Sequence, residues 1–180
     1  MSIDDSTRHS LGAQAGLPSS LGAAAPLLGQ DADLGPAQAA ELARLYAMLE
    51  VAFLAAAADG EINDAEADSL GATLGGWLGT QLSADVVEHI IEKFIAAHSA
   101  DGRDGRLAAV AAQLGADDRL AAYTLACLVV LCDLELSEHE LAVLGVIATG
   151  LELAQDLAQA RFEQVKEHVE NVVASAAQQA

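Results

Sequence analysis

Two acidic segments of the chain share one spacing of residues that could bind a cation. They are residues 59–66 (DGEINDAE) and residues 133–140 (DLELSEHE). Each opens on an Asp at the expected end of an apolar helix, and carboxylates beside free helix-end carbonyls are the oxygen ligands that Ca²⁺ prefers. The spacing therefore predicts a site for Ca²⁺ or another divalent cation, with both segments at one end of the domain. The predicted ligands are Asp59, Glu66, Asp133 and Glu140, assisted by Glu61 and Glu135.

Helix capping explains the last Glu of each segment equally well. Asn63 and Ser137 are preferred N-cap residues, and Glu66 and Glu140 follow them by three positions. This is the pattern of a capping box, which stabilises a helix start by about 1 kcal/mol. Capping does not explain the opening aspartates, because the helix macrodipole disfavours negative charge at a helix C-terminus. A metal site and capped turns with solvated acids both stay open.

The two segments belong to a longer internal similarity. Leu70-Gly71 corresponds to Leu144-Gly145, and Gly76 to Gly150, at the offset that relates the two opening aspartates. A constant offset over two helical segments indicates an internal duplication. We therefore expect a two-fold pseudo-repeat of helix, acidic turn and helix.

This arrangement resembles the tellurite-resistance TerB family, which is all-helical and built from two similar halves. In that family each half has an Asp-Gly-x-[Leu/Ile]-[Ser/Asp]-x-x-Glu turn after an Ala-rich helix. Residues 57–63 look like the first turn, residues 133–137 like the second, and residues 141–153 like the closing helix. The resemblance covers roughly residues 36 to 165, and it departs from the family at Leu134, where the second turn usually has Gly. It implies a non-enzymatic, divalent-cation-binding module of bacterial stress response.

Composition indicates an all-α protein and limits its partners. Hydrophobic residues make up 53% of the 180 residues, much of this is Ala, and aromatic residues make up only 3%. No alternating pattern of a half-buried strand is present. The net charge of −19, with only 8 Lys and Arg residues, excludes a general nucleic-acid binder, which needs a basic surface. Cations and basic protein surfaces remain as partners.

About seven helices are expected in one domain, residues 36–180. The expected third helix ends at a turn over residues 101–105, and the fifth should be central because it is apolar on every side through Cys132. The expected helices begin at Pro36, after Asn63, at Ser83 or Asp85, after Gly105, at Asp117, after Ser137 and near Glu152.

The last of these helices carries a seam of apolar residues at alternating spacings of four and three. Such a seam is typical of coiled-coil packing. It could pack within the monomer or form a homodimer through the C-terminal helix. The seam residues are Ala158, Phe162, Val165, Val169, Val172 and Ala176.

Residues 1–35 form a low-complexity arm that is expected to be disordered and dispensable for folding. The arm is unusually rich in leucine for a linker, so it could order against a partner or against its own domain. A plain Ala/Gly tail is the alternative. The leucines that could dock are Leu11, Leu17, Leu21, Leu27 and Leu28.

Enzymatic motifs are not found in the chain. No His follows a Glu by three residues, as di-iron bundles require, and no Gly-rich loop joins a strand to a helix. Cys127 and Cys132 have neither a zinc nor a redox spacing, so they are expected to be buried, reduced thiols of a cytoplasmic protein. Asp4 and Asp5 do not suit a signal peptide, and no apolar run is long enough to insert into a membrane.

Two functions follow. The first is the TerB-like divalent-cation module. The second is a metal-independent adaptor that recruits protein partners through its acidic surface and its N-terminal arm.

Overall fold

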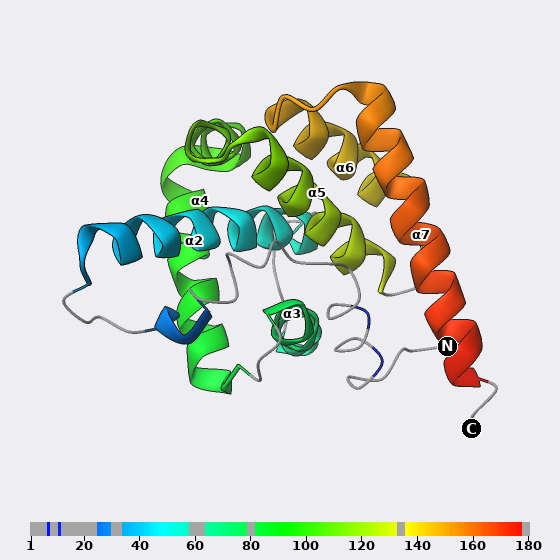
Figure 1. Ribbon diagram of the computed structural model, residues 1–180, viewed down its shortest axis with the longest axis horizontal. Helices are drawn as coiled ribbons and strands as arrows, with labels where there is room; N and C mark the ends of the chain where they lie inside the picture. Colours follow the sequence, from blue (N-terminus) through cyan, green and yellow to red (C-terminus); the bar gives the residue numbers. More distant parts are fainter. Residues whose placement is uncertain are drawn as a thin grey trace.

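The computed structural model describes residues 7, 11, 25–29, 34–57, 64–78, 82–132 and 136–177, without the side chains of residues 64–66, 176 and 177. These ranges contain helices and no strand (Figure 1). The prediction of an all-α fold is confirmed. The elements are the 3₁₀ helix η1 (Ala25–Leu27) and the α-helices α2 (Pro36–Ala56), α3 (Asp64–Leu78), α4 (Ala84–Gln113), α5 (Ala116–Leu131), α6 (Glu138–Gly150) and α7 (Gln155–Ala177).

Helices α2 and α5 form the centre of the structure and pack most extensively on each other. Residues 47–55 of α2 and 122–128 of α5 are buried without interruption, as expected of helices that are apolar on every side. Helix α4 packs on α2, and α7 packs on α5 (Figure 1). The predicted central position of α5 is confirmed. None of the described helices combines the length and the apolar character needed to cross a bilayer.

Helix α4 is bent where the sequence predicts a turn. Gly102 has φ 68° and ψ 171° and interrupts the helix, so residues 84–101 and 103–113 form two arms. The left-handed φ suits Gly, which has no Cβ to clash with the backbone. Because the expected third and fourth helices are joined through this bend, the described residues contain six α-helices, whereas the sequence suggested about seven.

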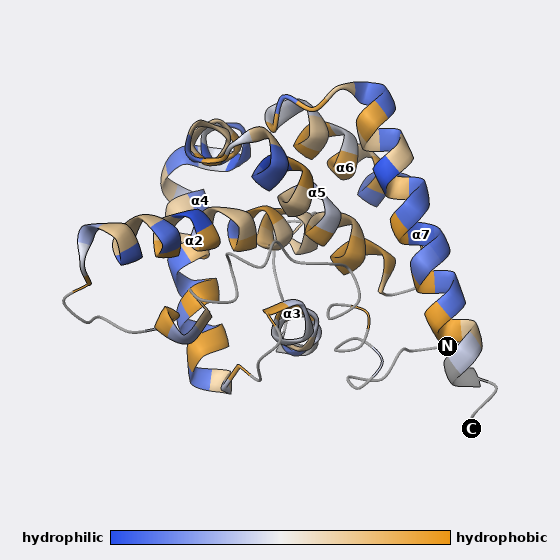
Figure 2. Ribbon diagram, viewed as in Figure 1, coloured by the Kyte–Doolittle hydropathy of each residue, from blue (hydrophilic) through white to orange (hydrophobic). Residues whose placement is uncertain are grey.

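The predicted seam of α7 faces the protein's own core. Ala158, Phe162, Val165 and Val169 are buried, and Val172 is half-buried. Figure 2 shows apolar and hydrophilic segments alternating along α7. Of the two expected roles of the seam, packing within the monomer is confirmed for these residues. Dimerisation through α7 stays a prediction.

The described part of the N-terminal arm packs on the helical domain. Leu11, Ala25 and Leu28 belong to the hydrophobic core, with exposed fractions of 0%, 5% and 5%. The backbone N–H of Gly29 donates a hydrogen bond to the Tyr46 hydroxyl at 3.4 Å. This burial argues against an arm that is dispensable for folding. The disorder predicted for the rest of residues 1–35 lies outside the described residues.

The arm leucines therefore differ in environment. Leu11 and Leu28 pack against their own domain, which was one of the two expected roles, while Leu27 is half-buried beside them. Leu17 and Leu21 lie outside the described residues.

Leu28 and Leu27 allow a matched test of this packing. We expect Leu28→Ala to lower the free energy of unfolding by about 2–4 kcal/mol, because it removes a buried side chain from the core. Leu27→Ala should cost less than about 1 kcal/mol, because Leu27 already contacts solvent. Urea denaturation of the full chain measures both values. Equal and small losses would contradict the packing of residues 25–29.

Candidate functional site

Most of the predicted cation site lies outside the described part of the chain. Glu140 is the only predicted ligand whose side chain is described, since α3 contributes only the backbone of Glu66. Within the described ranges, no group of three or more His, Cys, Asp or Glu side chains is arranged to hold a metal ion. The shared cation site stays a prediction. The predicted ligands outside the described residues are Asp59, Glu61, Asp133 and Glu135.

Glu140 caps the start of α6. The backbone N–H and the hydroxyl of Ser137 both lie 2.7 Å from Glu140 Oε2, and the Glu140 N–H donates to Ser137 Oγ at 3.1 Å. This reciprocal arrangement is the capping box expected from the sequence, and it is confirmed for this pair. It turns the Glu140 carboxylate toward its own helix start, with Oε2 already accepting two hydrogen bonds. The equivalent contact of Asn63 and Glu66 lies outside the described side chains.

A guanidinium group lies at the end of α2, where the first acidic segment begins. Arg103 follows the bend of α4, and its Nη2 donates to the carbonyl of Ala57 at 3.4 Å. Ala57 is the C-cap of α2, and its own N–H donates to the Phe53 carbonyl. A cation at this position is favoured by the negative end of the helix dipole. An arginine thus contacts one of the helix-end carbonyls that the sequence offered to a metal.

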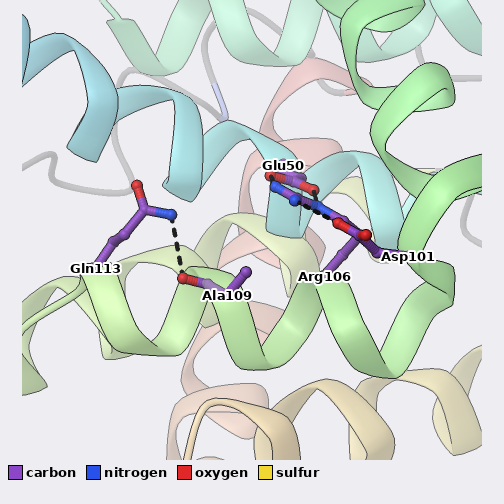
Figure 3. Close-up of polar contacts among 5 residues, drawn as sticks. All are labelled: Glu50, Asp101, Arg106, Ala109 and Gln113. Atoms are coloured by element: carbon purple, nitrogen blue, oxygen red, sulfur yellow. Dashed lines mark hydrogen bonds and ion pairs between the residues drawn. The ribbon is translucent and has the colours of Figure 1, made fainter.

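A second arginine from the same arm of α4 reaches a buried carboxylate (Figure 3). Arg106 Nε lies 2.6 Å from Glu50 Oε1, and Nη2 lies 2.9 Å from Oε2. Its Nη1 lies 3.0 Å from Asp101 Oδ2 on the other side of the bend. Glu50 is only 4% exposed although it is charged. The hydrogen bond with Glu50 raises the pKa of Arg106 above its ordinary value, while burial opposes this rise.

These contacts join three parts of the structure. Asp101 precedes Gly102, Arg106 follows it, and Glu50 lies in the buried half of α2. A bidentate pair of Arg and carboxylate is geometrically specific, so the pair fixes the second arm of α4 against α2. This cluster was not predicted from the sequence. The one feature that indicates it is a single acid, Glu50, within an otherwise apolar stretch of helix.

Two further arginines make structural contacts. Arg44 on α2 forms a two-point ion pair with Asp118 on α5, at 2.8 and 2.9 Å. Arg119 donates to the carbonyls of Ala111 and Leu114, at 2.7 and 3.1 Å, and so caps the C-terminal end of α4. Its remaining nitrogen pairs with Glu152.

The described surface carries many carboxylates and few positive charges to offset them. Four arginines are engaged in contacts between elements, and Lys93 lies 3.8 Å from the centre of the Tyr46 ring. With a net charge of −19 for the whole chain, little positive charge remains to offset the outer acids. Exposed acids of the described helices are Glu41, Asp68, Asp85, Glu88, Glu92, Asp101, Asp104, Asp117, Glu138, Asp156, Glu163, Glu167 and Glu170.

The two cysteines are buried thiols that form no disulfide with each other, as predicted. Burial raises the pKa of Cys127 to about 12, while the Tyr123 hydroxyl beside it opposes the rise. Because the thiolate is the reactive form of cysteine, Cys127 is a poor nucleophile at neutral pH.

Comparisons with other proteins leave the functional interpretation to the chain's own residues. No family model, curated protein or solved structure matches this chain. The resemblance to the TerB family therefore rests on the spacing within residues 59–66 and 133–140. The capping box, the arginine contacts and the acidic surface are the described features from which a function can be argued.

Glu50 and Arg106 can be removed singly or together. We expect Glu50→Leu to lower the free energy of unfolding by about 3–5 kcal/mol, because it leaves the Arg106 charge without its buried partner. Adding Arg106→Met should recover most of this loss, because no unpaired charge then remains inside. Urea denaturation at neutral pH measures both variants.

Asp101→Asn serves as the control for this pair. Asp101 is half exposed, with 50% of its side-chain surface accessible, so its ion pair should contribute less than about 1 kcal/mol. If the double variant were as unstable as Glu50→Leu, the ion pair would not be the cause of the loss.

Proposed function

We propose that the protein is a non-enzymatic adaptor that recruits a basic protein partner through its acidic surface, without a bound metal. The observation that carries this proposal is the use of four of its six arginines: Arg44, Arg103, Arg106 and Arg119 bind groups of the protein itself. The outward charge is therefore strongly negative. Such a surface attracts positively charged partners and accelerates their association.

The contacts at the acidic segments support an adaptor that works without a metal. Glu140 uses its carboxylate to cap α6, and Arg103 supplies a positive charge at the end of α2. The arginine thus does part of the work that a bound cation would do at the end of α2, while the cap occupies the Glu140 carboxylate. Leu17 and Leu21 of the N-terminal arm remain candidates for contact with the partner. The two buried thiols, which form no disulfide with each other, support a cytoplasmic location.

A divalent-cation-binding module of a tellurite-resistance-like bacterial stress response is the second candidate. It is favoured by the arrangement of the helices that lead into the acidic segments. Helices α2 and α5 pack together and run in the same general direction across Figure 1, so their C-terminal ends point toward the same side. Under this proposal α2 and α3 form one half of a pseudo-repeat, α5 and α6 form the other, and the acids between the helices of each half share the ion.

Calcium distinguishes the two candidates. A ligand that binds only the folded state stabilises it by RT ln(1 + L/Kd), where L is the free ligand concentration, so the melting temperature keeps rising as the ligand concentration exceeds Kd. For the adaptor we expect Ca²⁺ to raise the melting temperature no more than Mg²⁺ does, through general screening of the acidic surface. We also expect Asp59→Asn with Asp133→Asn to leave this rise unchanged. A Ca²⁺-specific rise that Mg²⁺ does not produce and that disappears in the double variant would support the cation module instead.

Binding of a basic peptide tests the adaptor directly. A fluorescent amphipathic helix with Lys beside its apolar face should bind the full chain, and its affinity should fall as NaCl is raised, because salt screens opposite charges. The same helix with Glu in place of Lys is the control and should not bind. Fluorescence anisotropy measures both. Equal binding of the two peptides, or binding of neither, would contradict the adaptor.

A further inference from the structure

Helix α6 has apolar residues on two opposite faces. Its inner face, Val143, Leu144, Ile147 and Ala148, is buried in the core. Its outer face consists of Leu141, Ala142, Gly145, Val146 and Thr149, all of which are exposed, with Leu141 at 44% and Val146 at 42%. These positions follow the spacing that places residues on one side of a helix. Because both its inner and its outer face are apolar, α6 does not have the polar outer surface that a surface helix normally has.

The outer face of α6 is also uncharged. Figure 2 shows α6 as hydrophilic at its start and apolar or neutral along the rest, whereas α7 is mostly hydrophilic. From Leu141 to Gly150 the helix has no charged residue. In a chain with a net charge of −19, a neutral apolar helix face marks a surface that another molecule could cover.

Gly145 leaves a notch in the middle of this face. A Cβ added there would have no atom within 4 Å, so packing within the protein does not require Gly. Gly in a helix interior is less favourable than Ala, and one benefit it can offer is the close approach of another backbone. Gly150 differs, because a Cβ there would meet Leu107 at 2.9 Å.

The corresponding glycine in the first half of the chain is covered by a helix. Gly71 aligns with Gly145 in the sequence, and a Cβ on Gly71 would meet Val87 of α4 at 3.1 Å. Gly75, which aligns with Thr149, is buried, while Thr149 is exposed. At these two positions α3 is more covered than α6, and at Gly71 the covering residue comes from α4. This correspondence indicates that the missing occupant is a helix with a β-branched residue over Gly145.

The charges around the outer face indicate the chemistry of the occupant. Glu138 is exposed at the start of the face, and Asp156 is exposed in the first turn of α7, shortly after the face ends in the sequence. Glu152 is exposed too, but it is already paired with Arg119. A second copy of the chain would bring the same acids against them, and like charges oppose association. A helix with Lys or Arg beside its apolar face would meet these acids favourably.

We propose that the outer face of α6 is the docking site for an amphipathic helix of a partner protein, with basic residues bordering the apolar face of that helix. Its apolar residues cover Leu141 and Val146, and a β-branched residue fits the notch at Gly145. This inference rests on the proposed adaptor function and locates its binding site. It belongs to the mode of recognition in which an amphipathic helix lies in an apolar groove.

The test uses the full chain and the Lys-bordered peptide with Val at the central apolar position. Gly145→Leu fills the notch and should weaken binding by about tenfold or more, as expected when a central contact is lost. Ala160→Leu makes a similar change at an exposed position of α7 and should leave the affinity unchanged. Melting curves establish folding, and we expect Gly145→Leu to melt no lower than the parent, because open space surrounds the position.

The other outcomes overturn the proposal in distinguishable ways. If the peptide binds Gly145→Leu as tightly as the parent and still responds to salt, the docking site lies elsewhere while the adaptor function stands. If no basic peptide binds the parent chain, the adaptor function fails together with this site. If sedimentation shows a dimer that Gly145→Leu dissociates, a second copy occupies the face and the partner helix is wrong.

Discussion

The ion pair between Glu50 and Arg106 determines how α4 lies on the central helices. Residues 47–55 of α2 are buried on every side, so a carboxylate at position 50 must find a cation inside the protein. Arg106 provides it at 2.6 and 2.9 Å from the second arm of α4. This pairing holds the bend at Gly102, and the bend brings Arg103 to the carbonyl at the end of α2. The helix end that leads into the first acidic segment is therefore positioned by the same arm of α4.

Features that depend on local pattern could be predicted from the sequence. The apolar run of α5 gave its central position, the spacing of Phe162, Val165 and Val169 gave the buried side of α7, and the glycines near residue 102 gave the bend in α4. The capping box of Ser137 and Glu140 spans three residues. Each of these features depends on residues close together in the sequence, so helical periodicity and capping preference are enough to predict it.

Features that join distant residues could not be predicted in the same way. Arg106 lies 56 positions from Glu50, and the sequence pattern around either residue does not predict that the two form a pair. The burial of Leu28 likewise depends on how residues 25–29 pack on the helical domain. The composition of residues 1–35 indicated only a low-complexity tail. For the candidate site, the sequence found the cap at Glu140, while the roles of Asp59 and Asp133 depend on residues outside the described structure.

The turn between α6 and α7 explains why one helix face is left open. After α6, the N–H of Leu153 donates to the Ala148 carbonyl and that of Glu152 to the Thr149 carbonyl, which is the Schellman arrangement of a helix end. Glu152 adopts a left-handed φ of 56°, unfavourable for a residue with a Cβ, and its side chain pairs with Arg119. Arg119 also caps α4, so the turn is tied to the ends of α4 and α5. Helix α7 consequently runs along α5 (Figure 1), and the outer face of α6 is left without the cover that α4 gives to α3.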